Sequence, residues 1–135
     1  MKILVTDDSN NWINHHVKCL KSFLPEDTII ETANWAKEGL DKITLNIDEP
    51  YDIIFTDMQM ESDFLPLYAG EWFIKQIKTY KEYSNTRIII ASAAPDIRRI
   101  AKNTMLIIFQ KECANLLTVT KNYLNKIFVL KFTYV

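Results

Sequence analysis

Short apolar segments of strand length alternate with longer amphipathic segments along this chain, and this alternation limits its possible folds more than any other feature. The apolar segments are rich in Ile, Val and Phe, as is typical of buried strands, and lie at 3–6, 28–32, 51–56, 87–91 and 105–109. Between and after them, apolar residues recur at helical spacing at about 9–24, 35–47, 70–80, 95–101 and 114–127. The pattern predicts five strands that alternate with five helices.

Such strands favour a parallel sheet. Strands that are apolar along their whole length are buried on both faces, so helices must cover both sides of the sheet. Right-handed crossovers then restrict the topology to a few doubly wound forms. A length of 135 residues suits one domain. We therefore predict an α/β domain over residues 1–127, followed by an apolar, β-prone extension at 128–135.

Composition excludes several classes of protein. The formal net charge is −1, which gives no electrostatic basis for binding nucleic acid or a membrane surface. The chain has only two glycines, Gly39 and Gly70, so P-loop and dinucleotide-binding motifs are absent. No apolar stretch reaches the roughly 20 residues of a spanning helix. The two cysteines, Cys19 and Cys113, are far apart, and a cytoplasmic protein with reduced thiols is predicted.

Polar and charged residues of particular types follow four of the five strands. Asp7 and Asp8 follow the first strand, Asp57 the third and Ser92 the fourth, and Lys111 comes shortly after the fifth. Ligands of open parallel sheets bind outside the carboxyl ends of the strands. Each residue alone has a simpler explanation, because acids and serines are common in turns and helix caps and lysines are common on surfaces. Their joint placement favours a functional site.

The residue types suit phosphoryl transfer. Three carboxylates in one cleft repel each other unless a cation compensates, and Mg²⁺ prefers carboxylate oxygen. A lysine supplies positive charge and a hydroxyl supplies a hydrogen bond to phosphoryl oxygens. Phosphoryl transfer depends mainly on such positioning and charge neutralisation.

The sequence resembles the receiver domains of two-component response regulators, the CheY-like family, over about residues 2–127. The resemblance is carried by four segments: ILVTDDS at 3–9, YDIIFTDMQM at 51–60, IIIASAAPD at 88–96 and IIFQKE at 107–112. It implies a flavodoxin-like fold, with a five-stranded parallel sheet of order 2-1-3-4-5 flanked by five helices.

The resemblance also implies roles for individual residues. Asp57 matches the phosphoacceptor, and Ser92 and Lys111 match the residues that contact the phosphoryl group. Mg²⁺ is the implied cofactor. Its implied ligands are Asp7, Asp8, Asp57 and the backbone carbonyl of Gln59.

The chain departs from the family pattern around this site. The family has a glycine about eight residues after the phosphoacceptor, whereas Gly70 follows Asp57 by 70 − 57 = 13 residues. The extra residues, within 61–69, form either a harmless surface insertion or a partner contact or lid. Glu112 stands where the family has a proline, and Ile108 stands where it has an aromatic switch residue. These departures leave open how phosphorylation is read out.

The leading hypothesis is a stand-alone receiver, and two alternatives are weighed against it. The receiver takes a phosphoryl group from a histidine kinase or phosphotransfer protein and signals to a downstream protein target, as a monomer or homodimer. It is not an enzyme beyond its own phosphorylation and dephosphorylation. The first alternative is a receiver-like interaction module that phosphorylation does not regulate. The second, a phosphatase of related layout, is disfavoured because Gln59 cannot transfer a proton where that chemistry requires an acid.

Aromatic and histidine residues outside this site are predicted to be structural. Trp12, Trp35 and Trp72 are expected in the core or half-buried against it. His15 and His16 are expected to be an ordinary pair on the first helix, because no site surrounds them.

Overall fold

The computed structural model describes residues 1–60, 69–92 and 107–110, with backbone only for residue 92 and for 107–110. The strands are β1 (Lys2–Thr6), β2 (Ile29–Ala33), β3 (Ile53–Thr56), β4 (Arg87–Ser92) and β5 (Ile107–Gln110). The helices are α1 (Asn10–Lys21), α2 (Ala36–Leu45), α3 (Ala69–Ile77) and the short 3₁₀ turn η1 (Lys81–Tyr83). The helices predicted at 95–101 and 114–127, and the extension at 128–135, lie outside the described residues.

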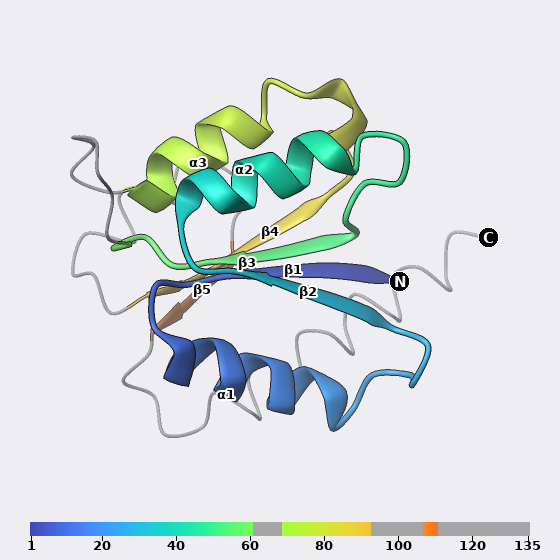
Figure 1. Cartoon of the computed structure of the whole chain (residues 1–135), viewed down its shortest axis with the longest axis vertical. Helices are drawn as coiled ribbons and strands as arrows, with labels where there is room; N and C mark the ends of the chain where they lie inside the picture. Colours follow the sequence, from blue (N-terminus) through green and yellow to red (C-terminus); the bar gives the residue numbers. More distant parts are fainter. Residues whose placement is uncertain (61–68, 93–106, 111–135) are drawn as a thin grey trace.

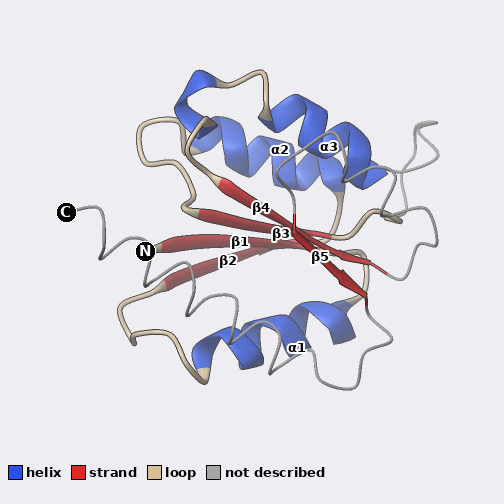
Figure 2. Cartoon of the chain, turned by 180° about the vertical axis from the view of Figure 1, so that it is seen from behind, coloured by secondary structure: helices blue, strands red, loops and turns tan. Residues whose placement is uncertain are grey.

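The strands form one parallel sheet in the order β2-β1-β3-β4-β5. The predicted α/β fold is thus confirmed, with the order 2-1-3-4 for the strands that hold the site, and β5 pairs with β4 at the edge. Figure 1 shows α2 and α3 on one face of the sheet and α1 on the other. The same three layers are seen from behind in Figure 2.

Each face of the sheet has its own hydrophobic core. Alternate residues of β1 and β3 point to opposite faces, as the strand period of two requires. Leu4 and Ile54 pack toward α2 and α3 with Phe73. Val5 and Phe55 pack on the other side with Leu20 of α1. The central strands are therefore buried on both faces, which explains why their sequences are apolar throughout.

The first helix begins at a capping residue. Ser9 is the N-cap, and its side-chain oxygen accepts a hydrogen bond from the backbone N–H of Trp12 at 3.4 Å. His16, on the inner face of α1, is buried and stacks on Phe55 of β3. His15 is exposed. Helix α1 thus packs against the sheet with one face, and the imidazole ring of His16 is part of that face.

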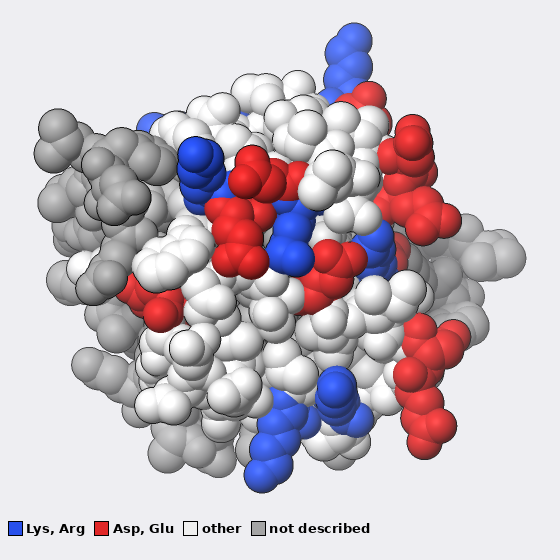
Figure 3. Space-filling model, viewed as in Figure 1, with Lys and Arg blue, Asp and Glu red and all other residues white. Residues whose placement is uncertain are grey.

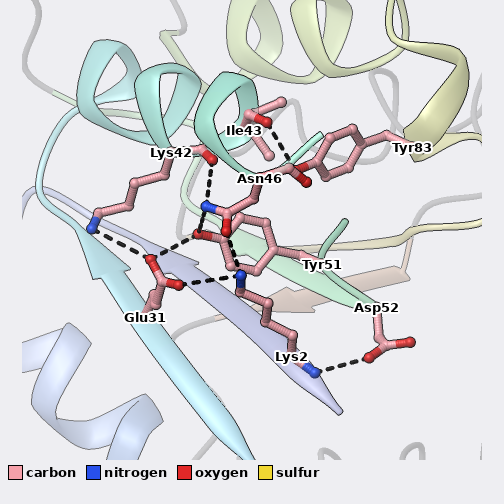
Figure 4. A network of polar contacts seen from close by, with 8 residues as sticks. All are labelled: Lys2, Glu31, Lys42, Ile43, Asn46, Tyr51, Asp52 and Tyr83. Carbon is pink, nitrogen blue, oxygen red and sulfur yellow. Dashed lines mark hydrogen bonds and ion pairs between the residues drawn. The ribbon is translucent and has the colours of Figure 1, made fainter. Parts of the chain in front are cut away.

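A polar network ties the end of α2 to the starts of the central strands (Figure 4). The Tyr51 hydroxyl donates to Glu31 Oε2 at 2.9 Å and accepts from Asn46 Nδ2 at 3.0 Å. Glu31 also pairs with Lys2 and Lys42, each at 3.6 Å. The Tyr83 hydroxyl donates to the backbone carbonyl of Ile43 at 3.0 Å. The network satisfies two buried phenols, as the interior of a protein requires.

We expect the two buried tyrosines of this network to make the fold sensitive to alkali. Burial raises the pKa of Tyr83 from 10.0 to about 12, and burial and the hydrogen bond to Glu31 raise the pKa of Tyr51 further. Because the folded protein holds these protons more tightly than the unfolded chain, their contribution to stability is complete below pH 10 and is lost as pH rises through 12. Urea unfolding from pH 8 to 12 measures this loss. The double variant Tyr51→Phe, Tyr83→Phe should lose less stability over that range; an equal loss would show that these tyrosines do not cause it.

The surface of the molecule carries both signs of charge. Figure 3 shows acidic and basic side chains intermixed on the face that it presents, in keeping with the formal net charge of −1. Within the described part of the chain, no helix combines the length and the apolar character needed to cross a membrane.

Candidate functional site

Three carboxylates meet at the carboxyl edge of the sheet. Asp7 and Asp8 follow β1, and Asp57 follows β3, the neighbour of β1 in the sheet. One oxygen from each of the three lies within 4.8 Å of the other two. Asp7 and Asp57 are 1% and 5% exposed, whereas Asp8 is partly exposed. The sheet thus brings together acids that are some 50 residues apart in the sequence.

Backbone hydrogen bonds hold two of these acids one residue beyond their strands. The N–H of Asp57 donates to the carbonyl of Thr6 at 3.0 Å, and the N–H of Asp7 donates to the carbonyl of Ala33 at 3.1 Å. These bonds continue the pairing of β1 with β3 and with β2. The backbones of Asp7 and Asp57 are therefore held as extensions of their strands.

The acid pair is also joined to the start of α1. Asp7 Oδ1 accepts a hydrogen bond from the N–H of Ser9, the N-cap of that helix, at 2.9 Å. A carboxylate near the amino end of a helix is stabilised by the unpaired N–H groups of the first turn. Asp7 thus orients the helix start as well as facing the other two acids.

The backbone after Asp57 is anchored in the core. Asp57 Oδ1 accepts from the N–H of Met58 at 2.7 Å. Met58 and Met60 are both buried, in the cluster under α2 and α3, and Gln59 between them is exposed. The backbone carbonyl of Gln59, which the resemblance implies as a metal ligand, therefore lies in a segment that is anchored on both sides.

Gly70, in the first turn of α3, lies directly against the backbone of this segment. Its N–H donates to the carbonyl of Met58 at 3.1 Å. A Cβ added to Gly70 would lie 2.0 Å from the backbone oxygen of Asp57 and 2.7 Å from the Cα of Met58. Although this glycine lies farther along the sequence than the family pattern predicts, it touches the candidate phosphoacceptor.

Of the two predicted phosphoryl contacts, only Ser92 is placed by the structure, and only through its backbone. Ser92 is the last residue of β4 and is in register with Gln110 of β5. Thr56 is in register with Ile90, so residue 92 lies just beyond the level of Asp57 at the same edge of the sheet. Lys111 follows Gln110 and lies outside the described residues. The roles of Ser92 and Lys111 therefore stay predictions.

The donor set of the acid cluster fits a hard divalent cation. Its three carboxylates offer oxygens, the ligands that Mg²⁺ prefers, and two of them are buried where mutual repulsion is least screened. Because one oxygen of Asp7 and one of Asp57 already accept backbone N–H donors, the carboxylates are oriented before any ion binds. Asp7, Asp8 and Asp57 would hold the ion, with the carbonyl of Gln59 as a further candidate ligand.

Sequence patterns missed the role of Thr56 at the site and the exposure of Trp35. Thr56 donates its hydroxyl to the backbone carbonyl of Asp57 at 3.0 Å, yet a threonine at the end of a strand carries no distinguishing signal. Trp35, expected to be packed, is 51% exposed, so that expectation is wrong. It is the N-cap residue of α2, two residues after the end of β2. Trp12 and Trp72 are partly buried against the two cores, as predicted.

Comparison with solved structures shows what this fold is similar to, whereas no family model and no curated protein matches the sequence. A response regulator receiver domain protein from Clostridium thermocellum is 24% identical, with a TM-score of 0.66, over 96% of this chain and 98% of the other. A CheY-like receiver domain from Methylobacillus flagellatus is 15% identical, with a TM-score of 0.73, over 94% and 98%.

A third similar structure was solved in a phosphorylated form. It is the phosphorylated cyanobacterial phytochrome response regulator RcpA, which is 15% identical with a TM-score of 0.72, over 90% of this chain and 89% of the other. These similarities span nearly the whole length of each chain and agree with the strand order and with the motifs in the sequence. The chain therefore has the fold of the response regulator receiver domains.

Proposed function

We propose that this chain is a receiver that accepts a phosphoryl group on Asp57 from a phosphohistidine of a histidine kinase or phosphotransfer protein. The observation that carries the proposal is the convergence of Asp7, Asp8 and Asp57 within 4.8 Å at the carboxyl edge of a receiver-type sheet. A structural explanation accounts poorly for this convergence, because two buried acids beside a third are unfavourable without a compensating cation.

The chemistry requires Asp57 to act as a nucleophile. A carboxylate oxygen of Asp57 forms a bond to phosphorus as the P–N bond to the donor imidazole breaks, and the imidazole nitrogen keeps the bonding electron pair and takes up a proton. A bound Mg²⁺ supplies positive charge that offsets the carboxylates and the incoming phosphoryl oxygens. The bond from the Met58 N–H holds one Asp57 oxygen and thereby sets the direction of the other.

The rest of the chain completes the proposal. Ser92 and Lys111 would contact the phosphoryl oxygens from the ends of β4 and β5, and two further helices would complete the five-helix receiver fold. The acyl phosphate would shift the surface toward a state that binds a downstream protein target, as a monomer or homodimer in the cytoplasm. The chain would catalyse only its own phosphorylation and dephosphorylation.

Intact-mass measurement with a small phosphodonor tests the proposal. Incubation with an acyl phosphate or phosphoramidate and Mg²⁺ should add one phosphoryl group per wild-type chain. No addition is expected for Asp57→Ala or for wild type with a chelator, because the nucleophile or the charge compensation is then missing. An unmodified wild type, or equal modification of Asp57→Ala, would overturn the proposal.

The alternative is a receiver-like interaction module that phosphorylation does not regulate. The departures at Ile108 and Glu112 favour it, because both fall where the family reads the phosphorylated state. Magnesium titration followed by tryptophan fluorescence separates the two functions. Binding at millimolar Mg²⁺ is expected for the phosphoacceptor, and no binding would favour the alternative.

A further inference from the structure

The backbone carbonyl of Asp57 is held from two sides. The Thr56 hydroxyl, buried at the end of β3, donates to it at 3.0 Å. Gly70, at the start of α3, leaves so little room beside the same oxygen that a Cβ would lie 2.0 Å away. A carbonyl held in this way fixes the peptide plane between Asp57 and Met58, because that plane is rigid.

The contact at Gly70 differs in kind from that at Gly39, the other glycine of the chain. A Cβ at Gly39 would meet Phe73 Cζ at 2.8 Å, the far end of a side chain in the contact between α2 and α3. That ring can move. At Gly70 the obstacle is the backbone of residues 57 and 58, which can move only if the site moves with it. The first turn of α3 and the backbone of the site therefore cannot move independently of each other.

We propose that Gly70 and Thr56 are positioning residues for the phosphoacceptor. Together they set the orientation of the Asp57–Met58 peptide and, through it, the Asp57 carboxylate and the carbonyl of Gln59. This inference rests on the proposed function and adds to it the elements that position the nucleophile. The Gly70 N–H also donates to the Met58 carbonyl, and this bond joins the two ends of the long segment between Asp57 and Gly70 beside the site. The length of that segment therefore need not disturb the site.

The expected consequence is a loss of chemistry that exceeds the loss of stability. A displacement of about 1 Å at a reacting group can lower a rate by about 100-fold. Gly70→Ala must displace the Asp57–Met58 backbone or the start of α3, so we expect at least a tenfold lower rate of Asp57 phosphorylation at saturating Mg²⁺. We also expect a higher Mg²⁺ concentration for half-maximal binding.

Gly39→Ala is the matched control for Gly70→Ala. Both variants add one methyl group to a buried glycine in a helix that faces the same core. Urea unfolding measures stability, tryptophan fluorescence measures Mg²⁺ affinity and intact mass measures the rate of phosphorylation. Gly39→Ala should change stability but retain the Mg²⁺ affinity and the rate of wild type, whereas Gly70→Ala should lose both.

A second pair of variants keeps the test decisive if Gly70→Ala does not fold. Thr56→Val removes the hydroxyl that donates to Asp57 without a change of shape. Thr86→Val is its control, since the Thr86 hydroxyl also donates to a backbone carbonyl, that of Tyr51 at 2.6 Å, but lies just before β4, at the opposite edge of the sheet from the acid cluster. Loss of one hydrogen bond predicts about a three- to tenfold lower phosphorylation rate for Thr56→Val. Thr86→Val loses a hydrogen bond of the same kind and should keep the phosphorylation rate of wild type.

The outcomes separate this inference from the proposed function. If wild type gains no phosphoryl group, the proposed function is overturned. If wild type is phosphorylated and Thr56→Val matches Thr86→Val in rate, only the positioning role is overturned. The same holds if a folded Gly70→Ala matches Gly39→Ala in Mg²⁺ affinity and rate. A selective loss in the variants that touch Asp57 supports it.

Discussion

Asp8→Asn is expected to lower the rate of Asp57 phosphorylation by about 100-fold or more at millimolar Mg²⁺, the scale of losing one preorganised electrostatic group from an active site. Asn keeps the size of the side chain and removes its charge. Asp8 lies with Asp7 and Asp57 in the acid cluster, and it is the most accessible of the three to a hydrated cation. With one carboxylate fewer, the cluster holds Mg²⁺ more weakly, and the incoming phosphoryl group meets Asp57 with less charge compensation.

Asp27→Asn is the control for this variant. Asp27 is an exposed acid just before β2, so it lies at the opposite edge of the sheet from the cluster. The Asp27→Asn variant loses the same charge from the protein as a whole, and its rate of Asp57 phosphorylation should equal that of wild type. Equal rates for Asp8→Asn and wild type would show that Asp8 takes no part in the reaction. Equal losses in both variants would show that net charge, and not the cluster, controls the rate.

Met58→Ala is expected to lower the free energy of unfolding by about 2–5 kcal/mol, the range for truncation of a large buried side chain. Met58 is 0% exposed and packs in the core beneath α2 and α3. Asp57 directly precedes Met58. The loss of packing at Met58 is therefore also expected to loosen the backbone that carries the nucleophile. A loss of this size is a large fraction of the stability of a typical domain, about 5–15 kcal/mol.

Met58→Leu distinguishes packing from chemistry at this residue. Leucine has a similar volume, so the loss should stay below about 1.5 kcal/mol and phosphorylation should persist. Urea unfolding and intact mass on the same preparations measure both quantities. A small loss for Met58→Ala would show that this segment is not anchored by its side chain. A loss of phosphorylation in a stable Met58→Leu variant would point to a role for the sulfur.

The strands were predictable because a strand that is buried on both faces is apolar along its whole length. The runs of isoleucine in β3 and β4 have the length and the β-branched composition of buried strands, and the predicted bounds of each strand lie within two residues of those observed. Ser9 and Asn10 are both residue types that favour the N-cap, and the structure has Ser9 in that position before α1. The exposed Trp35 was mispredicted, because whether a large aromatic residue is covered depends on elements distant in the sequence.

The site was predictable in part for the same reason. A parallel sheet brings the carboxyl ends of its strands to one edge, so the sequence alone predicts that Asp7, Asp8 and Asp57 converge. The contact of Gly70 with the backbone of Asp57 was not foreseen, because it depends on how the chain returns after a long connection. The network around Tyr51 and Glu31 was also missed, since it joins residues from three elements without a local pattern.

Peptide mapping after phosphorylation tests the central claim most directly. Wild-type protein is incubated with the small phosphodonor and Mg²⁺, digested under conditions that preserve acyl phosphates, and each peptide is weighed. We predict that the added phosphoryl group is found on the peptide that contains Asp57 and on no other. A phosphoryl group on His15 or His16, or on any peptide without Asp57, would contradict the assignment of Asp57 as the phosphoacceptor.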